Sequence, residues 1–472
     1  MSGEATKPGK RGRDMGEGTR NGTSSRRDCI RTIAAAGGAA ALAGCAPNTR
    51  AASDTGDREA ATLEAVHFPE GYPPYPSAEA TEGAFAVHVS PGNVGVMKAF
   101  GTELHFGQRE GARVQDAFTK KWYWDCHRNG TLYNLGHRNP DIIAAVKEAL
   151  HQLEIGNLLL VSGYKAKAAE KLVESTGGAL TGVTYTASGA EATEVAIRAT
   201  RGMTRRTKLV SIEASYHGHT CFALAAGDNP DNHERYLLDF DDFVVVPYND
   251  LGAMAAAVDE ETAAVLIESS PAQSGFPVPD SGYFQGVSDL CRKNGAKLII
   301  DEVQTGLGAT GKFWFWQHHG IVPDIVTVAK GLGGGILANA AVLLAPEIKE
   351  WFFDTAIPHS STFGGNELGC VATARVCDLT MAPGFLDHVN ALAVQFAEGL
   401  RGGPYRVNQH GLCMGILSDE MGKMEMTARL FNAGIFTVPA WYTDGGVEFR
   451  PILTLTENEA DEIIGIFRDT VG

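Results

Sequence analysis

The chain has 472 residues, of which 44% are hydrophobic and 20% are charged, a balance typical of a water-soluble globular protein. Its formal net charge of −16 argues against a surface that binds nucleic acid, and we expect no such partner. The eight cysteines include no pair at the two-residue spacing typical of zinc or redox sites, and we expect no metal.

The first 45 residues predict an export signal. The segment Ser25–Arg31 contains the adjacent arginines Arg26 and Arg27, a weakly apolar stretch covers residues 33–44, and Cys45 follows. This order resembles a twin-arginine signal, and Leu42–Cys45 resembles the lipobox that directs lipid attachment to the cysteine. We therefore expect export and a lipid anchor at Cys45, with a cytoplasmic protein that carries a disordered N-terminal extension as the alternative. No later stretch is apolar for long enough to span a bilayer, so we expect no transmembrane segment in the mature chain.

The remaining chain divides by composition. Residues 46–99 begin rich in Ala, Asp and Pro and are interpreted as a tether and an N-terminal segment. Residues 100–385 are expected to form a large domain, and residues 386–472 a small α+β domain that residues 100–150 help to complete. The small domain is expected to contain helices over residues 388–401 and 457–471.

From about residue 160, helical patterns alternate with short apolar runs. The predicted strands are Val183–Thr186, Leu209–Ile212, Phe243–Val246, Ala264–Ile267, Leu298–Ile300 and Ile325–Val328. Continuous apolar character means that both faces of each strand are buried, as in a mainly parallel sheet covered by helices. The sequence therefore predicts an α/β fold, in which ligands collect beyond the carboxyl ends of the strands.

Three polar residues follow directly after predicted strands: Glu268, Asp301 and Lys330. Lys330 alone could be a surface lysine, and Asp301 alone could be a helix cap. Together they place an amine and a carboxylate at one edge of the sheet. This pair suits pyridoxal phosphate (PLP), whose aldehyde reacts with a lysine and whose ring nitrogen needs an acidic partner. The glycines after Lys330, at 331 and 333–335, favour a buried turn over a surface position.

Other motifs near this edge have two interpretations each. Ser188 and Glu191 form a capping box at the start of a helix, and the same helix N-terminus could bind a phosphate. Tyr216 could pack in the core or stack on a pyridine ring. Thr362 could be a residue of a turn or part of a site.

Taken together, these motifs resemble the class III (omega-type) aminotransferases of PLP fold type I. The matching segments are Ser188–Ala192, Tyr216–Gly218, Asp301–Gly306, Ala329–Leu332, Ser361–Asn366 and Asn134–Pro140. The similarity extends from about residue 100 to the end of the chain. It implies a large PLP-binding domain with a small C-terminal domain.

The resemblance also implies roles for the matched residues. Lys330 forms a Schiff base with the cofactor and moves a proton between the substrate carbon and the cofactor, while Asp301 pairs with the ring nitrogen. Val303 and Tyr216 enclose the ring, and Gln304 reaches its hydroxyl group.

The remaining matched residues are expected around the phosphate and the ring. The phosphate is bound by Ser188, Gly189 and Ala190, joined by the partner subunit's Thr362. This last contact implies a homodimer with shared active sites. His217 and Glu268 complete the expected cofactor-binding residues.

Two departures from the family bear on the substrate. Many members carry Glu-Pro-Val/Ile-Gln-Gly-Glu, whose second glutamate pairs with an arginine three residues before a Pro-Pro-Leu. Gln273 and Glu448 occupy those two positions here. We therefore hypothesise that the protein does not use glutamate by the common route. A Glu448 that faces the pocket would disfavour a second carboxylate and favour a cationic or neutral side chain. An alignment shifted by two residues would instead give the arginine's role to Arg450.

The sequence thus predicts an aminotransferase that moves an amino group between an amine or amino acid and a keto acid or aldehyde. Aminomutase, racemase and decarboxylase activities remain alternatives, because they share the Schiff base and differ in the bond that is cleaved. A catalytically idle binding protein of the same fold is a further alternative, against which the lysine–aspartate pair argues. A nucleotide-binding enzyme is set aside, because no Gly-x-Gly-x-x-Gly follows the first strand.

Overall fold

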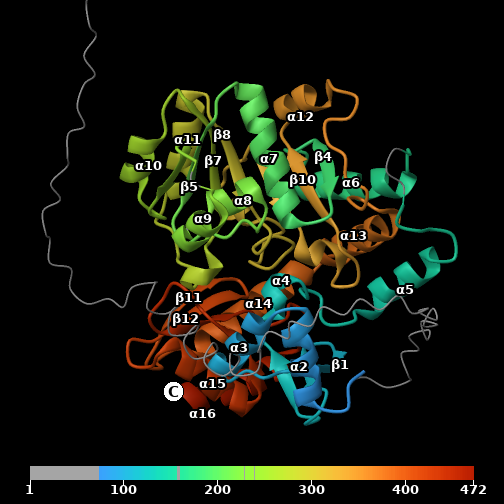
Figure 1. The fold of residues 1–472 in the computed structure, drawn as a ribbon, viewed down its shortest axis with the longest axis vertical. Helices are drawn as coiled ribbons and strands as arrows, with labels where there is room; N and C mark the ends of the chain where they lie inside the picture. The colour runs from blue at the N-terminus through green and yellow to red at the C-terminus, as the bar shows by residue number, and fades with distance from the viewer. Residues whose placement is uncertain (1–73, 157–159, 228, 239) are drawn as a thin grey trace, which may run out of the picture.

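The computed structural model describes residues 74–156, 160–227, 229–238 and 240–472 (Figure 1). The predicted export signal and most of the predicted tether lie outside these ranges. The described chain forms a large α/β unit and, below it in Figure 1, a smaller unit built from N-terminal and C-terminal residues.

A seven-stranded sheet lies at the centre of the large unit, in the order β4-β10-β9-β8-β7-β5-β6. β10 runs antiparallel to both of its neighbours, and the other pairs are parallel. The strands are β4 (Gly182–Thr186), β5 (Lys208–Ile212), β6 (Phe243–Val246), β7 (Thr262–Glu268), β8 (Lys297–Asp301), β9 (Ile325–Val328) and β10 (Ala340–Leu344). Each of the six predicted strands lies within one of these, which confirms the predicted mainly parallel sheet. β10 was not predicted.

Helices cover both faces of this sheet, which explains why its strands are apolar throughout. Alternate residues of β7 enter different cores. Val265 and Ile267 pack in the cluster that includes α11 (Tyr283–Asn294). Ala264 and Leu266 pack in the cluster that includes α7 (Gly189–Thr204). Every residue of β7 is consequently buried.

Two four-stranded sheets form the smaller unit, in the orders β1-β2-β3-β13 and β11-β12-β15-β14. The first contains β1 (Phe106–Glu110), β2 (Arg113–Asp116), β3 (Trp122–Asp125) and β13 (Ile435–Phe436); the second contains β11 (Arg406–His410), β12 (Cys413–Leu417), β14 (Val438–Pro439) and β15 (Gly446–Phe449). Because β13 pairs with β3, N-terminal residues complete this unit, as predicted.

Helices α14 (Phe385–Gly399) and α16 (Glu457–Val471) correspond to the two helices predicted in the smaller unit. α16 begins with a capping box in which Thr456 and Glu459 exchange hydrogen bonds. The other helices are α2 (Ala78–His88), α3 (Pro91–Phe100), α4 (Arg128–Thr131), α5 (Pro140–Ala149), α6 (Gly163–Ser175), α8 (Cys221–Ala226), α9 (Pro230–Tyr236), α10 (Leu251–Ala257), α12 (Pro346–Phe353), α13 (Glu367–Thr380) and α15 (Lys423–Ala433). None of the helices within the described ranges combines the length and apolar character that a membrane crossing requires.

Candidate active site

A cavity of about 490 Å³ lies beyond the carboxyl ends of the parallel strands. β7 ends at Glu268, β8 ends at Asp301, and Lys330 follows β9 by two residues. The register of the sheet pairs Glu268 directly with Asp301, which brings the two carboxyl groups to one edge. The predicted residues that line the cavity are Ser188, Gly189, Ala190, Tyr216, His217, Glu268, Asp301, Val303, Gln304 and Lys330. Ten of the eleven predicted site residues therefore line one cavity.

Lys330 supplies the amine of the site. It begins a short 3₁₀ turn, Lys330–Gly333, with a left-handed φ of 46°. Although part of the residue remains accessible, protein surrounds the amine, and this burial lowers its pKa to about 8. The positive charge of Arg450 lowers the pKa of Lys330 further, while Glu268, Asp301 and Glu448 oppose the shift. The amine is consequently easier to deprotonate than an ordinary lysine.

Asp301 is a buried carboxylate that two donors hold in place. His217 Nδ1 lies 2.8 Å from Asp301 Oδ2, and the backbone N–H of Val303 donates to Oδ1 at 3.0 Å. His217 Nε2 is buried and has no hydrogen-bond partner among the described residues. Since Asp301 accepts at Oδ2, the geometry favours the tautomer with the proton on His217 Nδ1. These contacts orient the carboxylate toward the cavity.

Glu268 accepts hydrogen bonds at both of its oxygens. The backbone N–H of Tyr216 donates to Oε2 at 3.0 Å, and Gln304 Nε2 donates to Oε1 at 3.2 Å. Burial raises the pKa of Glu268 to about 7 despite these donors. Glu268 therefore contacts both Tyr216 and Gln304, two residues that the sequence predicted to lie around the cofactor.

The N-terminus of α7 lines another part of the cavity. Ser188 is its N-cap and accepts from the N–H of Glu191 at 3.2 Å, as the capping interpretation predicts. The Glu191 side chain accepts from the N–H of Ala187 and not from that of Ser188, so the full capping box does not form. The N–H groups of Gly189 and Ala190 belong to the first helical turn, where no carbonyl of the helix can reach them. A Cβ on Gly189 would lie 3.3 Å from the side chains of Val303 and Ala329, and this tight contact would force one of them to move. Glycine at this position avoids that contact. Such a helix N-terminus suits an anion.

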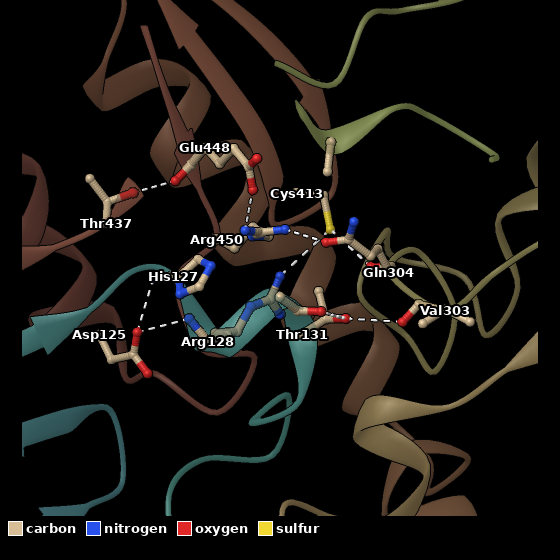
Figure 2. A network of polar contacts seen from close by, with 12 residues as sticks. Asp125, His127, Arg128, Thr131, Val303, Gln304, Cys413, Thr437, Glu448 and Arg450 are labelled. Carbon is tan, nitrogen blue, oxygen red and sulfur yellow. Dashed lines mark hydrogen bonds and ion pairs between the residues drawn. The ribbon is translucent and has the colours of Figure 1, made fainter. Parts of the chain in front are cut away.

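A second polar network joins the two units of the protein at this cavity (Figure 2). Arg450, directly after β15, forms an ion pair with Glu448 and donates from a terminal nitrogen to Gln304 Oε1 at 2.5 Å. Arg450 and Glu448 are 1% and 4% exposed. Burial raises the pKa of Glu448. The carboxylate of Glu448 is thus paired with Arg450 and does not line the cavity, so the condition that Glu448 faces the pocket is not met.

The segment α4, which follows β3, is a loop of left-handed residues rather than a regular helix, and it forms the wall beside the amine. Arg128, Asn129, Gly130 and Thr131 all have positive φ, between 45° and 77°, which is costly for the residues other than glycine. A Cβ on Gly130 would lie 3.0 Å from Lys330 Nζ and 3.5 Å from Gln304 Oε1. Gly130 therefore allows the backbone to approach the amine.

Contacts to both units hold this loop. The guanidinium of Arg128 donates to Asn134 and to the carbonyl of Leu412. Thr131 Oγ1 donates to the carbonyl of Val303 at 3.3 Å (Figure 2). Sequence reasoning missed Gly130 and named Arg450 only as the alternative candidate for the role of the family arginine.

Thr362 is the one predicted site residue that does not line the cavity. It is exposed on the segment between α12 and α13. His359 of the same segment lies 3.0 Å from Glu191 of α7, so this segment reaches the helix whose N-terminus lines the cavity. Within one chain, Thr362 does not join the other predicted residues.

The residues around the cavity fit PLP. The cavity offers a lysine amine for an aldehyde, a fixed carboxylate for a ring nitrogen, and a helix N-terminus for a phosphate. No cluster of three or more His, Cys, Asp or Glu side chains that could hold a metal is found in the described part of the chain.

Comparisons with known proteins agree with this chemistry. The model of the family described as aminotransferase class-III matches residues 100–471. An uncharacterised aminotransferase of Archaeoglobus fulgidus is 38% identical over 399 residues, which cover 80% of this chain and 91% of that protein. The acetylornithine aminotransferase of Methanopyrus kandleri is 32% identical over 367 residues, covering 77% and 92%. In structure, the chain is similar to the ornithine aminotransferase of Toxoplasma gondii, with a TM-score of 0.77, 24% identity, and coverage of 84% and 96%.

Proposed function

Because this chain belongs to the aminotransferase class-III family, whose enzymes depend on PLP, we propose that the cavity beside Lys330 is its cofactor site and carries its transferase chemistry. The protein is a PLP-dependent aminotransferase that moves an amino group between an amine or amino acid and a carbonyl acceptor. This assignment of the site depends on one observation: Lys330 and Asp301 line the same cavity at one edge of the sheet.

The roles of the two catalytic residues follow from their surroundings. When bound, PLP supplies an electron sink that stabilises negative charge on the substrate carbon. Lys330 attaches the cofactor and, with a pKa of about 8, accepts a proton at Nζ near neutral pH and returns it. Asp301, held by His217 and the N–H of Val303, keeps a proton on the ring nitrogen.

The other lining residues bind and orient. Val303 and Tyr216 enclose the ring, Gln304 binds its hydroxyl group, and the first turn of α7 binds the phosphate. Glu268 orients Gln304 by accepting its amide N–H. All of these residues line the same cavity as Lys330.

Absorbance and mass spectrometry test this site. The purified protein should absorb in the visible range, and borohydride should bleach this band and leave a phosphopyridoxyl group on the peptide that contains Lys330. The Lys330→Ala variant should carry no such group. Incubation with candidate amino acids then distinguishes transfer to a keto acid from an internal shift, an inverted stereocentre or released carbon dioxide. An unlabelled Lys330 in protein that has been loaded with PLP would refute the assignment.

We also propose a homodimer in which the partner subunit's Thr362 completes each phosphate site. Large apolar side chains are exposed on and near the segment that carries Thr362, among them Leu160, Val161, Phe353, Ile357 and Phe363. Several of them line a second hollow of about 350 Å³. An exposed apolar surface of this kind favours a second copy of the chain. Light scattering should give twice the mass of the chain.

For the substrate, we propose that this enzyme does not exchange glutamate by the common route. Gln273 cannot form the usual ion pair with an arginine, and Glu448 is neutralised by Arg450. Because this pair beside the cavity is neutral as a whole, it supplies no net charge that would select for a cationic side chain. A screen of amino donors tests the proposal: alanine, simple amines and ω-amino acids should serve as donors. Efficient turnover with glutamate and 2-oxoglutarate would contradict it.

We further propose that residues 1–45 direct twin-arginine export and that Cys45 becomes the lipid-bearing first residue. The sequence order of arginines, apolar stretch and cysteine supports this proposal. Twin-arginine export carries folded proteins, which is compatible with loading of PLP before export. Fractionation of the native host and determination of the mature N-terminus test it. A full-length chain in the cytoplasm would refute it.

A further inference from the structure

Arg450 contacts the cavity through another side chain. Its guanidinium is buried, pairs with Glu448 and donates to Gln304 Oε1 at 2.5 Å (Figure 2). On its other side, Gln304 donates from Nε2 to Glu268 at 3.2 Å. Gln304 itself lines the cavity with Lys330. A continuous chain of contacts therefore connects Glu448, through Arg450 and Gln304, to Glu268.

Elementary chemistry fixes the orientation of the Gln304 amide in this chain. A guanidinium has donors only, so the carbonyl oxygen of the amide must face Arg450. The NH₂ group then faces Glu268, which has the accepting oxygens. Glu268 and Arg450 thus favour the same orientation of the amide, one by accepting from its NH₂ group and the other by donating to its carbonyl oxygen. Without Arg450, the amide would be held at one end only and could turn away from the cavity. Arg450 therefore fixes the end of the Gln304 amide that Glu268 does not hold.

We propose that Arg450 is a positioning residue for the cofactor: it holds the carbonyl oxygen of Gln304 so that the amide acts as a hydrogen-bond donor to the ring hydroxyl oxygen of PLP. This inference rests on the proposed function, since it concerns the same cavity. It gives Arg450 a role that requires no contact with the cofactor. It also explains why an arginine is buried here with only one carboxylate partner, Glu448.

Arg450 has a second effect, which is electrostatic. Its charge is the largest influence after burial that lowers the pKa of Lys330, and Glu448 partly opposes it. Loss of the charge should therefore favour protonation of the Lys330 nitrogen. Loss of the hydrogen bond alone should weaken cofactor binding and leave this protonation nearly unchanged. The two effects can be separated by choosing substitutions that remove one or both.

Three variants of the holoenzyme make this separation. Arg450→Lys keeps the charge and removes the planar contact, Arg450→Met removes both, and Arg128→Lys is the control. Arg128 is equally buried and close to the same cavity, but it donates to Asn134 and Leu412 and not to Gln304. Two quantities are measured: the dissociation constant of PLP from the apoprotein, and the pH midpoint of the absorption change of bound PLP.

We expect Arg450→Lys to weaken PLP binding about fivefold, the equivalent of one ordinary hydrogen bond, with the midpoint nearly unchanged. Arg450→Met should weaken binding at least as much and raise the midpoint by about one unit. Arg128→Lys should change the midpoint little. In a Gln304→Ala background, Arg450→Lys should have no further effect on PLP binding, because its partner is gone.

Several results would overturn the inference. One is wild-type affinity for PLP in both Arg450 variants, and another is an equal loss of affinity with and without Gln304. Melting curves of the apoproteins identify a variant that fails to fold, and either Arg450 variant is sufficient for the comparison with the Gln304→Ala background. A wild-type protein that does not bind PLP would refute the proposed function instead, so the two failures are distinguishable.

Discussion

The lowered pKa of Lys330 predicts how the apoprotein takes up its cofactor. Only the neutral amine attacks an aldehyde, so the uptake rate should follow the neutral fraction of Lys330. Burial, supported by the charge of Arg450, lowers the pKa of this amine from 10.5 to about 8. The sign is clear: a lower pKa means more neutral amine at any pH below about 10, and hence faster uptake.

The size of the effect follows from the two pKa values. At pH 7.5, an ordinary lysine is neutral in about 0.1% of molecules, whereas a lysine with a pKa of about 8 is neutral in roughly a quarter of them. The difference is a factor of about 250. Part of this gain is offset, because nucleophilicity falls as an amine becomes less basic. We therefore expect uptake about 10- to 100-fold faster than for a surface lysine.

Stopped-flow mixing of the apoprotein with PLP, between pH 6 and pH 10, measures this dependence. The rate of appearance of the bound-cofactor band should rise with pH and level off with a midpoint near 8. The Lys330→Ala variant reports the slow reaction at other lysines and is subtracted. A rate that still rises in proportion to hydroxide between pH 8 and pH 10 would show that Lys330 is an ordinary lysine, and the electrostatic description of the site would be wrong.

The sequence alone was sufficient to predict those site residues whose positions depend on a local sequence pattern. Glu268 and Asp301 end neighbouring parallel strands, and parallel strands bring their carboxyl ends to one edge, so their proximity followed from the pattern alone. The same holds for Ser188, which caps the helix that follows β4. β10 was missed because an Ala-Ala-Val-Leu-Leu run has no period that separates a strand from a buried helix.

The rest of the site depends on tertiary contacts that no local pattern encodes. Arg450 comes from the smaller unit and Gln304 from the large one, and 146 positions separate them. No sequence pattern predicts the positive φ of Arg128 and Thr131, because such residues rarely adopt this conformation and only their surroundings impose it. Glu448 does not line the cavity and reaches it only through Arg450 and Gln304, a connection that could be seen only in the structure. Packing between units, which pattern reasoning does not reach, therefore determines the electrostatics around Lys330.

Three further predictions test the close approach of Gly130 to the amine, the role of the Asp301 carboxylate, and the sharing of sites through Thr362. Gly130→Ala should destabilise the apoprotein by about 1–2 kcal/mol in thermal melts and slow PLP uptake, whereas Gly402→Ala, at φ 83° with open space around it, should show only the loss of stability. Asp301→Asn should still bind PLP but lower the single-turnover rate about 100-fold, because a neutral amide no longer favours the protonated ring nitrogen. Thr362→Asp should weaken PLP binding by placing a carboxylate against the phosphate, as measured by titration of the apoprotein. If sites are shared, a mixture of Thr362→Asp and Lys330→Ala chains should regain activity, because each mixed dimer has one site with Lys330 from one chain and an unaltered Thr362 from the other. Activity of the mixture equal to the sum of the separate variants, after exchange of subunits has been verified by mass, would show that each chain completes its own site.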